Sequence, residues 1–195
     1  EQMELRGMSV VSANTDGFVT RVPRDRRWQF SATCADWELQ TGFNTEETEY
    51  LSLHSRDVNN YIAIATEHGK TKVKTKGAYA SSGPGLPGAA GQKKNPNMDI
   101  CTDAVVAYLK DGTPIEETIE WCTDPRRFLV VRRVTGGAMK DDLPIGKALR
   151  WYYSKDVQGG FVYAKNGNAV PESIGARPMM ELKDRVPAAL DFDYY

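Results

Sequence analysis

The stretch Val10–Val19, with the sequence VVSANTDGFV, is the part of the chain around which the rest can be arranged. Two short apolar runs, residues 8–11 and 18–22, flank the four residues Asn14–Gly17, which end in Asp-Gly. Asp-Gly between β-branched runs predicts a tight β-hairpin, because glycine accepts the positive φ that such a turn requires. The hairpin would place the carboxylate of Asp16 at its tip, although an aspartate in a turn is most often simply solvated.

The composition is that of an ordinary globular protein. The chain has 195 residues, of which 41% are hydrophobic and 26% charged, and its formal net charge is −1. A near-neutral chain has no global electrostatic attraction for nucleic acid, so any such binding must depend on local patches. The three cysteines are widely spaced, form no disulfide or zinc pattern and suit a reducing compartment. Because no apolar run could cross a membrane and no signal peptide is present, we expect a cytoplasmic protein with no membrane partner.

Beyond the hairpin, the pattern predicts one helix and a small antiparallel sheet. Apolar residues recur at helical spacing over residues 31–41, where Ser31 can cap the helix and Gly42 can end it. Strands are expected at 50–53, 61–66 and 70–77, and the last two should pair as a hairpin through the turn His68-Gly69.

The strand at 70–77 carries the most informative charge pattern of the chain. Lysines alternate with threonine and valine at positions Lys70, Lys72, Lys74 and Lys76. Alternate residues of a strand point to the same face, so these lysines should lie about 6.6 Å apart on one face, close to the spacing of phosphates along a nucleic-acid strand. Two interpretations stay open: a phosphate-binding face, or an edge strand that lysine protects from aggregation.

The second half of the chain follows a segment rich in Gly, Pro and Ser. Residues 79–93 have few side chains to bury and predict a linker between the modules 1–78 and 94–195. In the second module, helices are expected from Pro96 to about Lys110 and again from Thr113, where Thr113 and Glu116 would form a capping box.

The remainder of the second module should be a short turn, three strands and an irregular segment that contains several prolines. The turn, or a short helix, is expected to begin at Asp124-Pro125, and the strands are expected at 129–134, 149–153 and 161–164, the first of them ending at Gly136-Gly137. We therefore predict an α+β fold, with antiparallel β-hairpins and one packed helix followed by a mainly helical module with a few short strands.

Asp16 cannot form a catalytic metal site alone. Two-metal phosphoryl transfer generally requires at least two acidic ligands, and no second aspartate occurs in a convincing motif. The chain has no phosphate-binding loop, no nucleophile elbow and no Cys/His pair at catalytic spacing. A second basic neighbourhood contains Arg126, Arg127, Arg132 and Arg133. Together these features fit a protein that handles a polyphosphate or a nucleic acid.

Three short motifs, in order along the chain, resemble the B-family DNA polymerases. Residues 12–17 (SANTDG) are similar to the third palm motif of that family, usually Tyr-x-Asp-Thr-Asp-Ser. Residues 58–62 (VNNYI) stand where the family carries Lys-x-Tyr, and residues 74–77 (KTKG) are similar to its Lys-x-Lys-Gly strand. Segments 94–96, 112–116 and 150–153 resemble the thumb of bacteriophage members, so the resemblance covers essentially the whole chain.

The resemblance implies that residues 1–78 are the C-terminal part of a palm, residues 79–93 a linker and residues 94–195 a thumb. Asp16 would be the catalytic aspartate and, with Asn14, would bind two Mg²⁺ ions shared with residues outside this chain. The partners would be primer–template DNA, a dNTP and a complementary N-terminal polymerase region that supplies the exonuclease, the first palm motif and the fingers. The DNA contacts would come from Asn59, Tyr61, Lys70, Lys72, Lys74, Lys76, Lys94, Arg126 and Arg132.

Several positions depart from the family pattern. Asn14 stands in place of the first aspartate of the motif, and Asn59 in place of the lysine of Lys-x-Tyr. Ser12 replaces the tyrosine and Gly17 the serine of the third palm motif. Because the resemblance finds no exonuclease domain, first palm motif or fingers in this sequence, we expect a fragment or subunit of a DNA-directed DNA polymerase that is inactive alone. The alternative is a non-catalytic DNA-binding or interaction module that retains the thumb fold.

Overall fold

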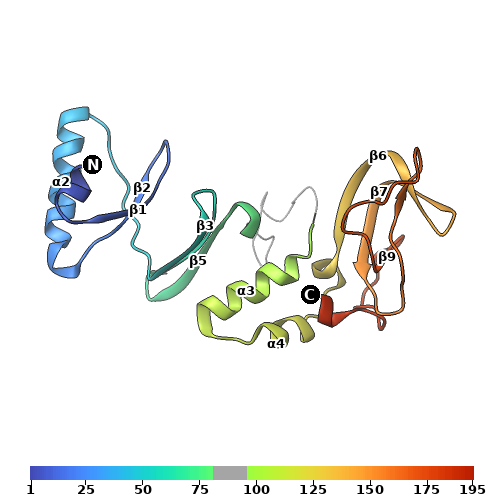
Figure 1. The fold of residues 1–195 in the computed structure, drawn as a ribbon. Helices are drawn as coiled ribbons and strands as arrows, with labels where there is room; N and C mark the ends of the chain where they lie inside the picture. The colour runs from blue at the N-terminus through green and yellow to red at the C-terminus, as the bar shows by residue number, and fades with distance from the viewer. Residues whose placement is uncertain (81–95) are drawn as a thin grey trace. The chain divides into compact units, whose positions relative to one another are not determined.

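A computed structural model describes residues 1–80 and 96–195, and the chain divides into two units, Glu1–Tyr79 and Ala80–Tyr195 (Figure 1). Every pair of strands in the described part is antiparallel, and helices occur in both units, so the predicted α+β class is confirmed. Most of the predicted linker, residues 79–93, lies outside the described residues. No helix in the described part is both long and apolar enough to cross a membrane.

The first unit contains a hairpin, a three-stranded sheet and two α-helices. The hairpin β1–β2 is present as predicted, and the sheet has the strand order β3–β4–β5. In chain order the elements are α1 (Gln2–Leu5), β1 (Ser9–Ala13), β2 (Phe18–Arg21), the 3₁₀ turn η1 (Arg24–Arg26), α2 (Arg27–Thr41), β3 (Ser52–Asp57), β4 (Asn60–Glu67), β5 (Lys70–Lys76) and the 3₁₀ turn η2 (Gly77–Tyr79).

Helix α2 begins earlier than predicted and is less packed. It starts at Arg27, and the Ser31 hydroxyl donates back to the Arg27 carbonyl (3.3 Å) instead of capping the helix. Gly42 ends the helix as predicted, in the left-handed conformation with φ 75°. The expectation of a packed helix is wrong, since Trp28 is 68% and Leu39 88% exposed. The short helix α1 contacts α2 but leaves these side chains exposed.

Strand β4 forms the centre of the three-stranded sheet. Its residues Ile62, Ala63, Ile64 and Ala65 are at most 6% exposed. The predicted turn His68-Gly69 joins β4 to β5, and both residues have positive φ, 50° and 74°. Positive φ at both central residues is the geometry of a tight two-residue hairpin loop, which aligns the two strands without a bulge.

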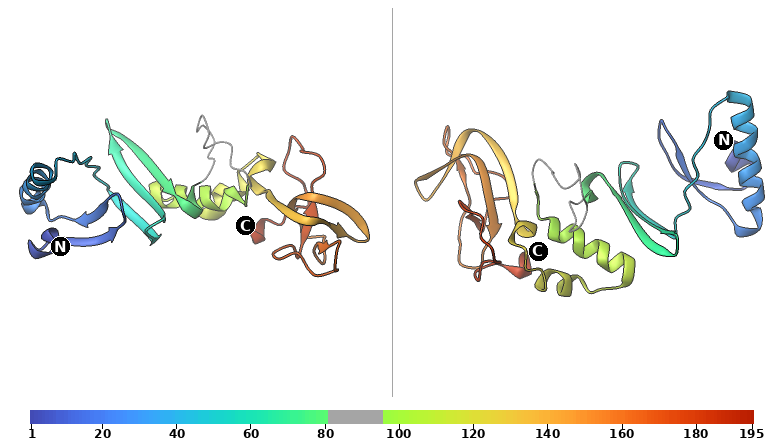
Figure 2. Two further views of the ribbon diagram at one scale, coloured as in Figure 1. Left: turned by 90° about the horizontal axis from the view of Figure 1, so that it is seen from above. Right: turned by 180° about the vertical axis from the view of Figure 1, so that it is seen from behind.

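The second unit is built around a four-stranded antiparallel sheet of order β8–β6–β7–β9, which Figures 1 and 2 show in yellow to red. The prediction that the second module is mainly helical is therefore wrong. Its elements are α3 (Asp99–Asp111), α4 (Ile115–Glu120), the 3₁₀ helix η4 (Pro125–Phe128), β6 (Val130–Lys140), β7 (Leu143–Tyr153), β8 (Val162–Tyr163), β9 (Ala176–Pro178) and the 3₁₀ turn η5 (Phe192–Tyr194).

The sheet is larger than predicted because β6 does not end at its glycines. Gly136 and Gly137 have φ of 82° and 86°, and the strand continues through them with an irregular register between Arg133 and Ala138. A side chain at Gly137 would approach the carbonyl of Gly146 on β7 at 3.4 Å. The two glycines thus permit a bulge between long strands, a common role of glycine inside a strand.

Two helix starts also differ from the prediction. Helix α3 begins at Asp99, because the Pro96 carbonyl accepts a hydrogen bond from the Val131 N–H (2.8 Å) and holds that segment against β6. The expected capping box of α4 is not formed. The hydroxyl of Thr113 donates instead to the Asp111 carboxylate (2.6 Å), although the short 3₁₀ helix after Asp124 is present as predicted.

Hydrophobic side chains pack on both faces of this sheet. Consecutive residues of β7 point to opposite faces, so Trp151 and Tyr153 enter one core with Phe161, while Tyr152 enters the other with α3, α4 and η4. The hydroxyl of Tyr195 donates to the Phe128 carbonyl (2.7 Å) and accepts the Tyr153 N–H (3.0 Å). The C-terminal residue therefore contributes hydrogen bonds to the interior of this unit, and burial raises the pKa of its phenol.

Candidate functional site

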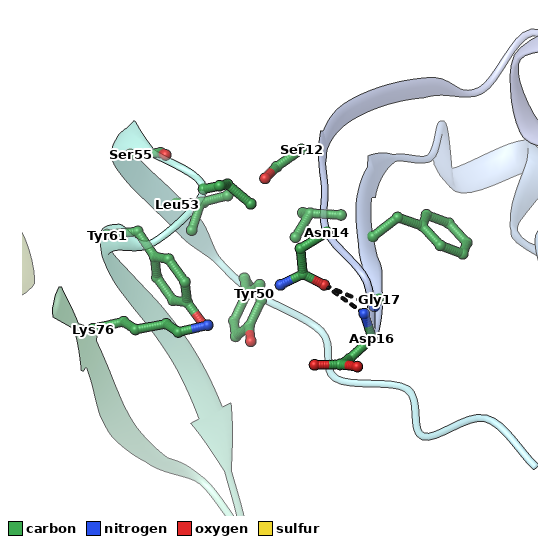
Figure 3. A pocket seen from close by; sticks show the side chains of 12 residues that line it. Ser12, Asn14, Asp16, Gly17, Tyr50, Leu53, Ser55, Tyr61 and Lys76 are labelled. Carbon is green, nitrogen blue, oxygen red and sulfur yellow. Dashed lines mark hydrogen bonds between the residues drawn. The ribbon is translucent and has the colours of Figure 1, made fainter.

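The Asp16 carboxylate lies at the tip of the β1–β2 hairpin, and the side chain of Asn14 shapes that tip (Figure 3). The Asn14 side-chain oxygen accepts the backbone N–H groups of Asp16 (3.0 Å) and Gly17 (2.8 Å), while the Asn14 N–H donates to the Gly17 carbonyl (2.9 Å). Gly17 does not adopt the positive φ that was expected there. The hydrogen bonds of the Asn14 side chain stabilise the turn instead. The turn itself is confirmed, with a different residue as its organiser.

A pocket of about 250 Å³ in the first unit brings the hairpin tip together with the three-stranded sheet. Asn14 and Asp16 line it from the hairpin, and Tyr50, Tyr61 and Lys76 line it from the sheet and the segment before it. In Figure 3 the side chains of Tyr61 and Lys76 both extend toward the hairpin that carries Asn14 and Asp16. Residues of all three sequence motifs thus share one pocket.

The register of β4 and β5 explains how two of these motifs meet. Tyr61 lies directly opposite Lys76, and the Lys76 amino group is 5.9 Å from the centre of the Tyr61 ring. Gly77 has φ 65°, and a β-carbon at this position would lie less than 3.0 Å from the Asn59 carbonyl oxygen and from Asn60 Oδ1. The glycine after the lysine strand is therefore required by its close approach to the β3–β4 turn.

That turn is held by a carboxylate. The Asn60 amide donates to both oxygens of Asp57 (2.7 and 2.8 Å), and the Asn59 N–H donates to one of them (2.9 Å). These hydrogen bonds, those from Asn60 above all, lower the pKa of Asp57. Asn60 Oδ1 in turn accepts the Ala78 N–H (2.7 Å), which connects the turn to the end of β5. The Asn59 side chain, predicted to contact DNA, is exposed at this turn.

The lysines of β5 lie on one face, as their spacing predicts. All four are exposed, whereas Val73 and Thr75 between them are half-buried. Lys72 forms an ion pair with Glu67 (2.7 Å), so part of its charge is neutralised, while Lys76 faces the pocket. Contact of these lysines with DNA stays a prediction.

The predicted arginine contacts in the second unit are engaged within the protein. Arg126 forms a bidentate pair with Asp124 (2.8 and 3.0 Å from its Nε). Arg132 donates to Glu172 (2.5 Å) and to the Pro171 carbonyl (2.7 Å), and it lies over the ring of Trp151. Their contact with DNA stays a prediction that these pairings do not favour. Lys94 lies outside the described residues.

Two arginines that were not predicted to contact DNA are exposed, unlike the half-buried Arg132. Arg133 and Arg150 lie on neighbouring strands, where Val131 is opposite Arg150, and neither forms an ion pair with any residue that the structure describes. The alternation of side chains along a strand places Arg133 on the opposite face of β6 from Arg132. Because Val130 and Val134 are buried, Arg132 shares their face and Arg133 the opposite one.

The described residues do not complete a magnesium site. They contain no group of three or more His, Cys, Asp or Glu side chains placed to hold a metal ion. Asp16 is the single carboxylate that lines the pocket in this part of the chain, and the Asn14 oxygen is occupied by two backbone N–H groups. The pocket thus offers one carboxylate, and metal binding by Asp16 and by Asn14 stays a prediction.

No family model, no curated protein and no solved structure matches the chain in comparisons with each.

Proposed function

We propose that the chain is part of a DNA-directed DNA polymerase, with residues 1–78 as the C-terminal part of the palm and residues 94–195 as the thumb. The observation that carries this proposal is the pocket shared by Asp16, Tyr61 and Lys76, which lie far apart in the sequence. The order of the three motifs suggested a common site, and the fold of the first unit places one residue from each beside the same cavity.

In this proposal, Asp16 is the metal ligand and the sheet binds the primer–template. Magnesium, when bound, would neutralise the triphosphate of a dNTP and activate the primer 3′-hydroxyl. The hairpin holds the backbone of Asp16 in a turn fixed by side-chain and backbone hydrogen bonds, which presents its exposed carboxylate at the tip. The exposed lysines of β5 would bind backbone phosphates without reading sequence, as would the predicted contacts Arg126 and Arg132 of the second unit.

The test is primer extension by the chain combined with a complementary polymerase region that supplies the first palm motif and the fingers. Asp16→Asn keeps the size of the side chain and removes its charge, so we expect extension to fall at least about a hundredfold, because a metal ligand contributes several kcal/mol to the transition state. Asp25→Asn is the matched control, since Asp25 is exposed in η1 and does not line the pocket. Equal synthesis by the Asp16→Asn and wild-type complexes would refute the catalytic assignment.

A second candidate is a DNA-binding or interaction module without catalysis. Asn14 favours it, because the residue in the position of the first family aspartate serves the turn and carries no charge. In that case the isolated chain should still bind duplex DNA, and Lys74→Glu should weaken binding and reduce the slope of log K against log salt by about one. Lys183→Glu, at an exposed loop position of the second unit, is the control. Duplex binding combined with undiminished extension by Asp16→Asn would select this candidate.

A further inference from the structure

Helix α2 presents a stripe of apolar side chains to solvent. Four exposed residues form this α2 stripe, namely Trp28, Ala32, Ala35 and Leu39. At about 100° per residue, their side chains lie within about 60° of arc on the helix surface. Another side of the helix faces its own unit, where Thr33 is buried and its hydroxyl accepts a hydrogen bond from Arg6. Helix α1 lies beside α2 (Figure 1) and leaves the α2 stripe exposed.

The α2 stripe has the spacing of a seam between two helices. Its four residues are separated by four, three and four positions, which is the a/d spacing of paired helices. The large side chains of Trp28 and Leu39 are at the ends, and the two alanines between them allow a second helix to approach closely. Single exposed apolar residues are normal on a protein surface, but a continuous stripe indicates an interaction face.

A second copy of α2 in antiparallel orientation matches the α2 stripe. The midpoint between Trp28 and Leu39 along the sequence is also the midpoint between Ala32 and Ala35. A two-fold axis through this point would place Trp28 of one copy beside Leu39 of the other, and Ala32 beside Ala35. The large side chains would then pack against each other at both ends, and the small ones at the centre.

The charges at the two ends of α2 also favour the antiparallel orientation. Arg24 and Arg26, just before the helix, are exposed and form no ion pair with any residue that the structure describes. The acidic segment 46–49 (EETE) follows the helix, and its pairing with Arg27 neutralises only part of its charge. Antiparallel helices bring the basic start of each copy to the same end as the acidic segment of the other, whereas parallel helices would bring the arginines of both copies together.

We propose that the chain forms a symmetric dimer through an antiparallel contact between the α2 stripes of two copies. One helix pair is smaller than a standard protein interface, so the dimer should be weak, with a dissociation constant of about 1–100 μM. The contact lies on α2 alone and does not depend on the proposed polymerase function.

Sedimentation velocity of the full chain over a range of concentrations tests the dimer, with a reducing agent present so that Cys34 cannot form a disulfide. We expect the average mass of the wild type to rise from that of a monomer towards that of a dimer. Ala35→Glu places a carboxylate at the centre of the contact and should weaken the dimer at least about tenfold. Gln40→Glu is the matched control, because it adds the same charge at an exposed position of α2 outside the stripe, and it should change the dissociation constant by less than about threefold.

A double variant tests the antiparallel register. Ala32→Lys combined with Ala35→Glu would place opposite charges side by side across the two-fold axis, so association should recover at least about threefold relative to Ala35→Glu alone. Circular dichroism should show the same helix content in all variants, because the substituted positions are exposed.

Three results would overturn the proposal: a wild type that stays monomeric at about 300 μM, equal association of the wild type and Ala35→Glu, or no recovery in the double variant. Protection of α2 amides from hydrogen exchange only after addition of the complementary polymerase region to a monomeric chain would assign the α2 stripe to that partner, and would also overturn it.

Discussion

Gly77 shows how one residue fixes the junction between the β3–β4 turn and the end of β5, whose residue Lys76 lines the Asp16 pocket. It follows Lys76, has a positive φ of 65° and lies against the Asn59 carbonyl and the Asn60 side chain. No other residue type combines that backbone conformation with so close an approach. The glycine of the Lys-x-Lys-Gly motif can therefore be understood from packing alone, whatever the function of the chain.

Gly77→Ala should destabilise the first unit by about 2 kcal/mol or more, because a β-carbon adds a steric clash to an unfavourable backbone conformation. Gly69→Ala is the matched control. Gly69 has φ 74° but open space around it, so its substitution should cost only about 1 kcal/mol. Urea unfolding followed by circular dichroism measures both values. Equal losses in the free energy of unfolding for the two variants would show that the steric clash at Gly77 does not affect stability.

At the scale of elements, hydrogen bonds from side chains hold two turns whose geometry glycine positions alone do not determine. Asn14 organises the β1–β2 turn, and Asp57 organises the β3–β4 turn by accepting hydrogen bonds from Asn59 and Asn60. The β1–β2 turn lines the pocket through Asn14. The β3–β4 turn supports it indirectly, because Asn60 binds the Ala78 N–H just after β5, the strand that ends with the pocket residue Lys76. The protonation state of Asp57 should therefore affect the order of this region.

The stability of the β3–β5 sheet should depend on pH in the acidic range. The pKa of Asp57 is lower in the folded state than its ordinary value of about 4, so the ionised form stabilises the fold. This contribution is present above about pH 4 and is lost as the pH falls through the lower folded pKa. Asp57→Asn should flatten the pH dependence of unfolding below pH 4, measured by urea titrations at several pH values. Unchanged dependence in the variant would assign the acid sensitivity to other carboxylates.

At the scale of the whole molecule, the two units differ in how much core they contain. In the described residues, the first unit buries Met3, Met8 and the centre of β4, whereas the second has two hydrophobic cores on opposite faces of its sheet. The apolar side chains of α2 add little, since most are exposed. Because burial of apolar surface is the main stabilising term of folding, the first unit should be the less stable one.

We therefore expect the isolated chain to unfold in two steps, the first unit before the second. Hydrogen exchange followed by mass spectrometry should show amides of β4 exchanging at lower denaturant concentration than amides of β7. The same experiment on the complex with the complementary polymerase region should increase protection in α2 and β4 if that region binds the first unit. Coincident exchange of β4 and β7 in the isolated chain would contradict the expected order.

Local features of the chain were predictable from the sequence because they depend on neighbouring residues. The β1–β2 hairpin, the His68-Gly69 turn and the end of α2 at Gly42 follow from steric preferences of a few adjacent residues. The single face of the β5 lysines follows from strand alternation. The same alternation, applied to β6, would also have distinguished Arg133 from Arg132.

The remaining features required the tertiary structure, because they depend on contacts between distant residues. Pairing with β7 carries β6 through Gly136-Gly137, where the local signal predicts an end, and so replaces a mainly helical unit by a sheet. Arg132 binds Glu172, a partner on a distant segment that no local pattern indicates. The hairpin and the β4–β5 register bring three distant residues to one pocket, namely Asp16, Tyr61 and Lys76. Lys140 is buried because its strand ends over Phe161. Local sterics thus determined the turns and strand faces, and long-range pairing decided which side chains share a site.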